Sequence, residues 1–118
     1  MNSLPLVSIA IPAFNPRFFE RTLNSAVSQT YSNLDIVVCD DSRGDEIKDI
    51  VSLIMEQTGA QVRYVRNPQT LGLVGNLKAC LEQARGEFIK FLCDDDLPRA
   101  ERRRHAAGRA LPAPSRVP

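Results

Sequence analysis

Three consecutive carboxylates, Asp94, Asp95 and Asp96, are the residues of this sequence best suited to chemistry. They follow directly on the apolar run 88–92, which has the length and composition of a short buried strand. Adjacent carboxylates repel one another, and a bound divalent cation removes this repulsion. Hard oxygen ligands of this kind favour Mg²⁺ or Mn²⁺. The pattern predicts a cation site, and its alternative is a solvated acidic loop that holds no ligand.

Polar segments follow three other apolar runs in the same way. These segments are Pro12-Ala13-Phe14-Asn15, Asp40-Asp41 and Arg66-Asn67. Carboxylates accept hydrogen bonds from a base N–H or a ribose hydroxyl, and an Arg side chain can bind a base carbonyl or a phosphate. For Arg66 the alternative is an ion pair at the rim with Asp40 or Asp41. All these side chains meet in one place only if the apolar runs are neighbouring parallel strands.

The hydrophobic pattern predicts such strands, alternating with helices. Apolar runs at 7–11, 34–39, 62–65 and 88–92 predict strands, and helical periodicity predicts helices over 17–29, 45–58 and 73–84. We expect Asn15 to cap the first helix with Pro16 in its first turn, and Gly59 to end the second. Leu73, Leu77 and Leu81 are expected to form the buried face of the third. The fold class is therefore α/β, a doubly wound parallel sheet in three α/β/α layers.

The common glycine-rich phosphate sites are absent from the sequence. No G-x-G-x-x-G turn follows the first strand, and no Gly-Lys-Ser/Thr occurs anywhere. A cation held by carboxylates is the other common way to bind a diphosphate. In a parallel sheet, ligands bind outside the carboxyl ends of the strands, which is where all four polar segments fall. This placement favours a nucleoside diphosphate as the ligand.

The same four segments, in order and spacing, resemble the nucleotide-binding half of family 2 glycosyltransferases, which have the GT-A fold. The resemblance covers residues 6–98 and rests on the segments 7–15, 35–42 and 86–96, together with Arg66, Asn67, Gly72 and Asn76. It implies a Rossmann-like nucleotide-sugar-binding domain at 1–98. The implied nucleotide-binding residues are Pro12, Ala13, Phe14, Asn15, Asp40, Asp41, Arg66, Asn67, Asn76 and Asp94.

The resemblance also implies roles for these residues. Asp40 and Asp41 would contact the base, commonly uracil, and Asp94, Asp95 and Asp96 would form the D-x-D motif that binds the ribose and the metal, Mg²⁺ or Mn²⁺. The family often has Leu-Asp-x-Asp-Asp, which places Cys93 where the first Asp is expected. Two registers follow: Asp94 pairs with Asp96, or Asp95 and Asp96 act together.

The implied reaction is transfer of a sugar from a nucleoside diphosphate, with UDP favoured, to a hydroxyl of a glycan, lipid or other acceptor. The family inverts the anomeric centre, which requires a carboxylate general base. That base normally lies well beyond the D-x-D motif, and no residue of this chain is a candidate for it. The resemblance therefore implies a chain truncated after the motif, which binds donor without turnover.

Composition sets further limits. The chain has 118 residues, 43% of them hydrophobic, and a formal net charge of +1, typical of one globular domain. Residues 99–118 contain six Arg and one Glu, which leaves a net charge of −4 for the rest. We expect this Arg/Ala/Pro-rich segment to be a disordered tail, either a fragment end or an out-of-frame product, with a basic arm for anionic membranes or nucleic acid as the sharper alternative. The acidic body does not have the charge of a nucleic-acid-binding domain.

Location and redox state follow from simple counts. Three widely spaced Cys residues predict reduced thiols and neither a zinc site nor a disulfide framework. No apolar run approaches the ~20 residues of a membrane span, and no signal peptide is visible. We therefore expect a cytoplasmic protein, with peripheral membrane association left open.

Two other function classes fit parts of the pattern. A non-catalytic nucleotide-binding or regulatory module would use the same fold and the same edge of the sheet. A receiver-type phosphate-transfer domain would also bind Mg²⁺ through clustered Asp residues, but its acidic cluster follows the first strand. Here that position holds Pro12-Ala13-Phe14-Asn15, so the receiver-type domain ranks last.

Overall fold

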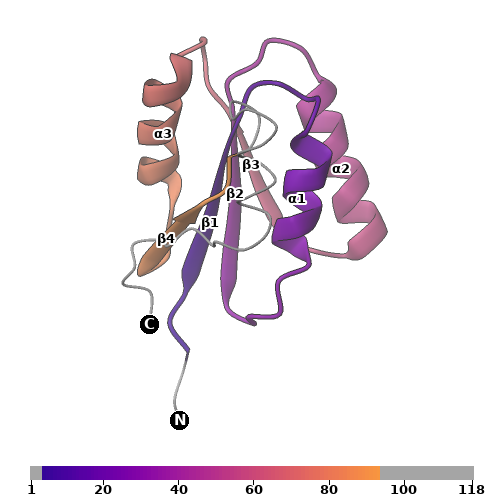
Figure 1. Ribbon diagram of the computed structural model, residues 1–118, viewed down its shortest axis with the longest axis vertical. Coiled ribbons are helices and arrows are strands. Elements are labelled where there is room, and N and C mark those ends of the chain that lie inside the picture. Colours follow the sequence, from indigo (N-terminus) through magenta and orange to yellow (C-terminus); the bar gives the residue numbers. More distant parts are fainter. Residues whose placement is uncertain (1–3, 94–118) are drawn as a thin grey trace, which may run out of the picture.

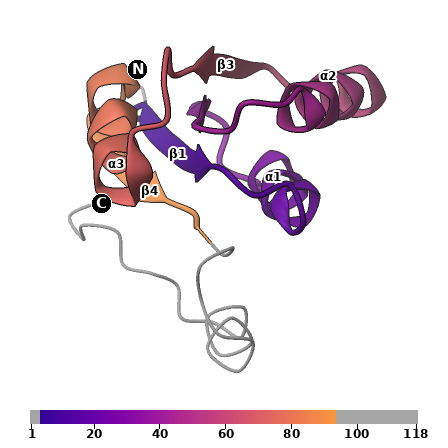
Figure 2. The same cartoon turned by 90° about the horizontal axis from the view of Figure 1, so that it is seen from above.

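The computed structural model describes residues 4–93, and these form a four-stranded parallel sheet with helices on both faces. The strand order is β3-β2-β1-β4. Helices α1 and α2 cover one face and α3 covers the other (Figures 1 and 2), so the predicted α/β fold in three layers is confirmed. The elements in chain order are β1 (Val7–Ala13), α1 (Phe19–Val27), β2 (Leu34–Asp40), α2 (Glu46–Thr58), β3 (Val62–Arg66), α3 (Gly72–Gln83) and β4 (Phe88–Phe91).

Two hydrophobic clusters hold these layers together. Between the sheet and α1/α2, the buried side chains include Ile9, Ile11, Leu23, Ile47 and Ile54. The cluster under α3 is smaller and consists of Ala10, Val37, Cys39 and Cys80, with Val65, Ile89 and Phe91 packed against it. Alternate residues of β1 and β2 enter opposite clusters, which explains why the middle of each strand, residues 9–11 and 36–39, is continuously apolar.

Strand β1 runs two residues further than predicted, through Pro12 to Ala13. The Ala10 carbonyl accepts the Leu92 N–H, so even-numbered residues of β1 direct their backbone groups toward β4. Pro12 therefore faces that side as well, beyond Ala10, which is the last β1 residue in register with β4. Its missing N–H costs no ladder bond there, which is the condition under which a strand accepts proline.

The start of α1 differs from the prediction. Asn15 does not cap the helix; its Oδ1 accepts the Arg17 N–H at 2.9 Å, and residues 16–18 form a turn before the helix begins at Phe19. The short Asn side chain satisfies the nearest backbone donor and makes a local turn in place of a cap. By contrast, Gly59 ends α2 in the left-handed conformation, with φ 77°, as predicted.

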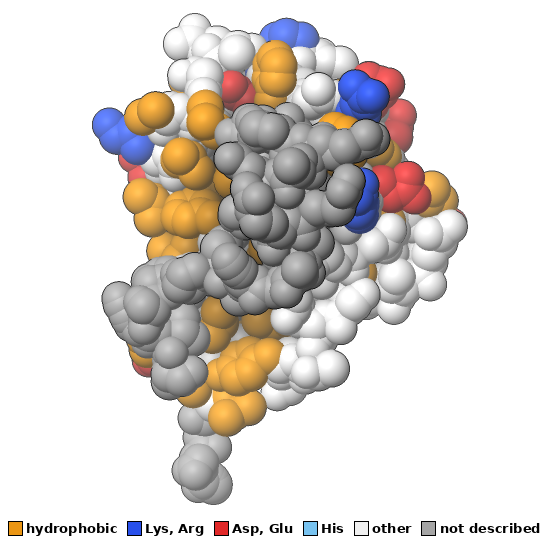
Figure 3. All heavy atoms as spheres, viewed as in Figure 1, with side chains coloured by type: hydrophobic (Ala, Val, Ile, Leu, Met, Phe, Trp, Pro, Cys, Tyr) orange, Lys and Arg blue, Asp and Glu red, His pale blue; other side chains and the backbone are white. Residues whose placement is uncertain are grey.

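The expected buried face of α3 is wrong. Leu73 and Leu81 are 52% and 50% exposed, whereas Asn76 and Cys80 face the sheet. The Asn76 side chain donates to the Cys39 carbonyl at 3.0 Å, and this buried bond orients the helix. Leu73, Val74 and Leu81 therefore lie on the surface, where Figure 3 shows hydrophobic side chains gathered over α3 and β4.

Within residues 4–93, none of the helices is long and apolar enough to span a bilayer. The predicted tail, residues 99–118, lies outside the described residues.

Candidate functional site

The carboxyl ends of β1, β2 and β3 are joined into one edge, as predicted. The Asp41 N–H donates to the Ala13 carbonyl at 2.8 Å, and the Asn67 N–H donates to the Asp40 carbonyl at 2.9 Å. Strand β4 runs parallel to β1 and ends at Phe91, three residues before Asp94. Asp94, Asp95 and Asp96 themselves lie outside the described residues.

Asp41 is a buried anchor of this edge. It is 2% exposed, and its Oδ1 accepts the Asn67 Nδ2–H at 2.8 Å and the Leu71 N–H at 2.8 Å. The second oxygen, Oδ2, accepts the Gly72 N–H at 3.0 Å. Leu71 and Gly72 stand at the start of α3, where backbone donors lack partners within the helix and favour a negative charge. The Asp41 carboxylate thus fixes the start of α3 against the end of β2.

Asn67 and Asn76 complete the same network. The Asn67 Nδ2 also donates to Asn76 Oδ1 at 2.8 Å, and both side chains are buried. Because the Asn76 amide also donates to the Cys39 carbonyl, the network links the end of β2, the loop after β3 and α3. Asp41, Asn67 and Asn76 therefore hydrogen-bond with one another and with the backbone beneath the rim.

Asp40 is also fully buried, and both of its oxygens have donors. Oδ1 accepts the Ser42 N–H at 2.9 Å and the Ser42 hydroxyl at 2.6 Å. Oδ2 accepts the Tyr64 hydroxyl. Burial and the bond to the Asp40 carboxylate raise the pKa of Tyr64 to about 12, because both disfavour the phenolate. Tyr64 and Ser42 thus occupy both carboxylate oxygens of Asp40 and fix the orientation of its side chain.

Replacing Tyr64 by Phe is expected to change the pH dependence of stability. The folded-state pKa of Tyr64, about 12, lies above the ordinary value near 10. The protonated hydroxyl therefore contributes stability that is fully present below pH ~10 and is lost as the pH rises through ~12. The wild-type chain should lose stability over that range in chemical denaturation, whereas Tyr64→Phe should lack this part of the loss. At neutral pH the variant should be about 1–2 kcal/mol less stable, because Asp40 loses a donor. Parallel alkaline profiles for the two proteins would contradict the Tyr64–Asp40 bond.

Arg66 forms ion pairs at the rim, which was the alternative considered for it. Its Nη2 lies 3.3 Å from Asp45 Oδ1 and 3.6 Å from Asp40 Oδ2, and it also donates to the Gly44 carbonyl. The side chain is 32% exposed. Its Nε atom is buried, and this N–H donor has no hydrogen-bond partner among the described residues.

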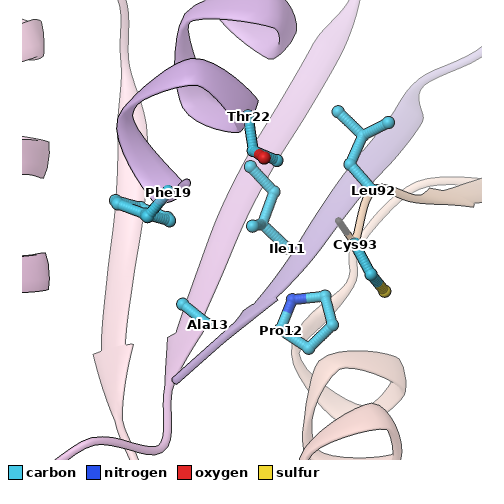
Figure 4. A pocket seen from close by; sticks show the side chains of 7 residues that line it. All are labelled: Ile11, Pro12, Ala13, Phe19, Thr22, Leu92 and Cys93. Carbon is cyan, nitrogen blue, oxygen red and sulfur yellow. The ribbon is translucent and has the colours of Figure 1, made fainter. Parts of the chain in front are cut away.

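Of the segment predicted to line a pocket, only Phe14 and Asn15 are exposed. Pro12 and Ala13 belong to β1 and are buried, whereas Phe14 is 56% exposed. An open hollow nearby lies between β1, α1 and the end of β4, and Figure 4 shows the side chains that line it. Its volume of about 10 Å³ is the room of one water molecule. The described part of the edge is therefore a set of exposed groups around an open surface, with no closed ligand cavity at this hollow.

Comparison with known proteins decides the family. The family model described as glycosyl transferase family 2 matches residues 8–110, which is most of the chain. The chain belongs to glycosyl transferase family 2. The resemblance inferred from the four polar segments is thereby confirmed.

Relatives within glycosyl transferase family 2 are longer proteins. The chain is 37% identical over 94 residues to the Escherichia coli UDP-Glc:alpha-D-GlcNAc-diphosphoundecaprenol beta-1,3-glucosyltransferase WfaP, a match that covers 79% of this chain and 36% of WfaP. The chain spans about a third of the length of the curated relatives it matches.

Solved structures share the fold of this family 2 chain. TarS 1–349 from S. aureus superposes with a TM-score of 0.65 at 27% identity, over 86% of this chain and 31% of that one. A Pyrobaculum calidifontis mannosyltransferase solved with GDP-Man and Mn²⁺ has a TM-score of 0.66 at 23% identity, over 76% of this chain and 28% of that one. Both likenesses support the GT-A-like α/β fold.

Whether the side chains at this edge could bind a cation depends on which carboxylates, imidazoles and thiols lie close together. Within residues 4–93, no group of three His, Cys, Asp or Glu side chains is placed to hold a metal ion. Asp40 and Asp41 are buried and bonded to protein donors, as described above. The predicted cation ligands Asp94, Asp95 and Asp96 lie outside the described residues, so the cation site stays a prediction; carboxylate oxygens of this kind suit Mg²⁺ or Mn²⁺.

Two residues at this edge, Tyr64 and Ser42, were not predicted as site residues from the sequence. Tyr64 alternates with Arg66 on β3, and Arg66 is in register with Asp40. This period-two spacing was the available signal, because residues i and i+2 of a strand share a face. The prediction took residues 62–65 as a short strand and assigned no role to the Tyr64 hydroxyl.

Proposed function

We propose that this chain binds a nucleoside-diphosphate sugar, preferably a UDP-sugar, as the donor part of a metal-dependent, inverting glycosyltransferase. The observation that carries the proposal is the joined carboxyl edge of β1, β2 and β3, next to which β4 leads into three carboxylates. Family membership supports it, as does the UDP-Glc named as donor of WfaP. The UDP-GlcNAc and Mn²⁺ found with structural neighbours are consistent with it.

The exposed groups are the ones proposed to contact the nucleotide. Phe14 offers an aromatic face to the base, and Arg66, whose side chain is 32% exposed, offers its guanidinium group to a base carbonyl or phosphate. Asp40 and Asp41 act beneath them: they hold Ser42, Tyr64 and the start of α3 in place. In this proposal the two acidic residues shape the floor of the base site, and Asn67 and Asn76 support it.

Asp94, Asp95 and Asp96 are proposed to hold the cation and to contact the ribose. A divalent cation bound there would neutralise charge on the departing diphosphate. The chain's own residues orient the donor from one side: Phe14 and Arg66 at the base, the acidic run at the diphosphate.

Transfer itself requires a carboxylate that activates the acceptor hydroxyl, and no residue of this chain is assigned that role. The second candidate function is therefore nucleotide binding without turnover. The acceptor proposed for a complete enzyme is a sugar hydroxyl on a lipid or glycan, the lipid-linked type being that named for WfaP.

Calorimetry with UDP, UDP-glucose and GDP, each with Mn²⁺ and again with EDTA, tests the proposal. We expect UDP and UDP-glucose to bind at least about tenfold more tightly with Mn²⁺, a difference of ~1.4 kcal/mol, and GDP to bind more weakly. Equal affinity with Mn²⁺ and EDTA would contradict metal-dependent donor binding. A transferase assay beside it separates the two candidates, since multiple turnovers would rule out the binding-only function.

Replacing Phe14 by Ala is expected to weaken UDP binding by about tenfold, because stacking on an aromatic ring is worth ~1–3 kcal/mol per base. The melting temperature should stay unchanged, because the side chain is exposed. The matched control is Leu53→Ala, another exposed apolar residue, on α2. If both variants bind UDP like the wild type, Phe14 does not contact the base.

A further inference from the structure

A partly buried polar cluster lies at the opposite rim of the sheet, where the strands begin. Ser8 of β1 donates its hydroxyl to Asp35 Oδ2 of β2 at 2.6 Å. Arg63 of β3 binds the same carboxylate through Nε at 2.9 Å and Nη2 at 3.0 Å. We name Ser8, Asp35 and Arg63 the Asp35 clamp.

The Asp35 clamp also holds the turn that leads from α3 into β4. The Ser8 hydroxyl accepts the Gly86 N–H at 2.8 Å and the Arg85 N–H at 3.1 Å. Arg63 Nη2 donates to the Gln83 carbonyl at 2.6 Å. Three strands and the end of α3 are thus joined through one carboxylate.

Asp35 is stabilised as the charged form. Burial alone would raise its pKa, but hydrogen bonds from Arg63, Ser8 and the Arg85 N–H lower it below the ordinary value. A two-point Arg–carboxylate contact of this kind fixes orientation as well as charge. The geometry of the Asp35 clamp therefore fixes the positions of the three strands and of the end of α3 relative to one another.

What it positions is β4, which is short and has one described neighbour. Its four residues pair with β1 alone among the described strands, from Val7↔Phe88 to Ala10↔Phe91. A strand with so few ladder bonds has a weakly specified register, and a slip by one residue moves it about 3.3 Å and exchanges its two faces. The fixed entry at Gly86 prevents such a slip. A Cβ at Gly86 would lie 2.6 Å from the Ser8 nitrogen and 2.7 Å from the Leu6 oxygen, so the turn lies against β1.

We propose that Ser8, Asp35 and Arg63 are positioning residues that set the register of β4 and thereby present Asp94, Asp95 and Asp96 to the cation. The inference rests on the proposed function, because it assigns the clamp a task at that site. The inference goes beyond the proposed function because it assigns control of the cation site to residues at the far rim, which touch no substrate. A purely structural role would change stability alone.

The test uses Arg63→Lys and Ser8→Ala, with Val51→Ala as a matched control. Lys keeps the charge of Arg63 but not its two-point contact, and Arg63 is partly exposed, so this variant should stay folded. Val51 is a buried residue of α2 in the other layer, and its truncation lowers stability without touching β4. Thermal melts matched between variants and control remove stability as an explanation.

Two measurements then separate positioning from stability. The first is the ratio of UDP affinity with Mn²⁺ to that with EDTA, which should fall about tenfold in both clamp variants and stay unchanged in Val51→Ala. The second is the rate at which a thiol reagent modifies Cys93, just after β4, read by mass spectrometry against the fully buried Cys39 and Cys80. This rate should change several-fold in the clamp variants only.

Each result has one meaning. A wild-type Mn²⁺ effect that the clamp variants keep, with an unchanged Cys93 rate, would overturn this inference and leave the proposed function standing. A wild-type chain without any Mn²⁺ effect would contradict the proposed function, and this inference with it.

Discussion

Replacing Asp94, Asp95 and Asp96 together by Ala is expected to remove the Mn²⁺-dependent part of UDP affinity, a loss of at least about tenfold. The reason is that Asp40 and Asp41 are buried and bonded to protein donors, so they cannot take over as cation ligands. Calorimetry with Mn²⁺ and with EDTA measures the loss. The melting temperature should change little, since the run follows the last described strand.

The control for this triple variant removes the same charge elsewhere. Asp49, Glu56 and Glu82 are exposed on α2 and α3, and their replacement by Ala should leave the Mn²⁺ effect intact. An equal loss in both triple variants would indicate a general effect of net charge and would contradict a specific site.

Single replacements decide between the two registers of the acidic run. If Asp94 pairs with Asp96, Asp95→Ala should retain the Mn²⁺ effect. If Asp95 and Asp96 act together, Asp94→Ala should retain it instead.

Replacing Asp41 by Ala should be the most destabilising single change at the edge, at about 3 kcal/mol. Three donors lose their acceptor: that of Asn67 is buried, and those of Leu71 and Gly72 are partly buried. A buried donor left without a partner costs ~1–3 kcal/mol. Denaturant unfolding followed by circular dichroism measures the change. UDP binding should weaken as well, because the loop after β3 and the start of α3 lose their common anchor.

Asp45→Ala is the natural comparison for Asp41. Its side chain is 75% exposed, and exposed ion pairs such as that with Arg66 contribute ~0–1 kcal/mol. Similar losses of stability for the two variants would contradict the anchoring role of Asp41.

The sequence predicted the layers and the shared edge because both follow from patterns along the chain. Continuous apolar runs such as 34–39 mark buried parallel strands, and polar residues after them must meet at one edge. The predicted bounds were short at Pro12 and Asp40, since a proline or a carboxylate ordinarily ends a strand. Both are accepted here for tertiary reasons: β4 stops short of Pro12, and Tyr64 and Ser42 bind Asp40.

The orientation of α3 could not be predicted from its own residues. Its leucines form the more apolar stripe, yet Asn76 and Cys80 face the sheet. The deciding bonds run from Asn76 to Asn67 and to the Cys39 carbonyl, 9 and 37 residues away. The Asp35 clamp likewise joins residues that are distant in sequence, so its hydrogen bonds do not follow from any local pattern.

The broadening of amide signals by Mn²⁺ in ¹⁵N-labelled protein saturated with UDP tests the central claim most directly, since the unpaired electrons of the ion act over a limited distance. The account predicts that amide signals from residues 13–15, 40–45, 66–67, 69–72 and 93–96 are broadened. Signals from residues 59–62 and 84–87, at the rim where β3 and β4 begin, should persist. Broadening centred on that opposite rim, or none beyond what free Mn²⁺ causes, would contradict a nucleotide–cation site at the carboxyl edge of the sheet.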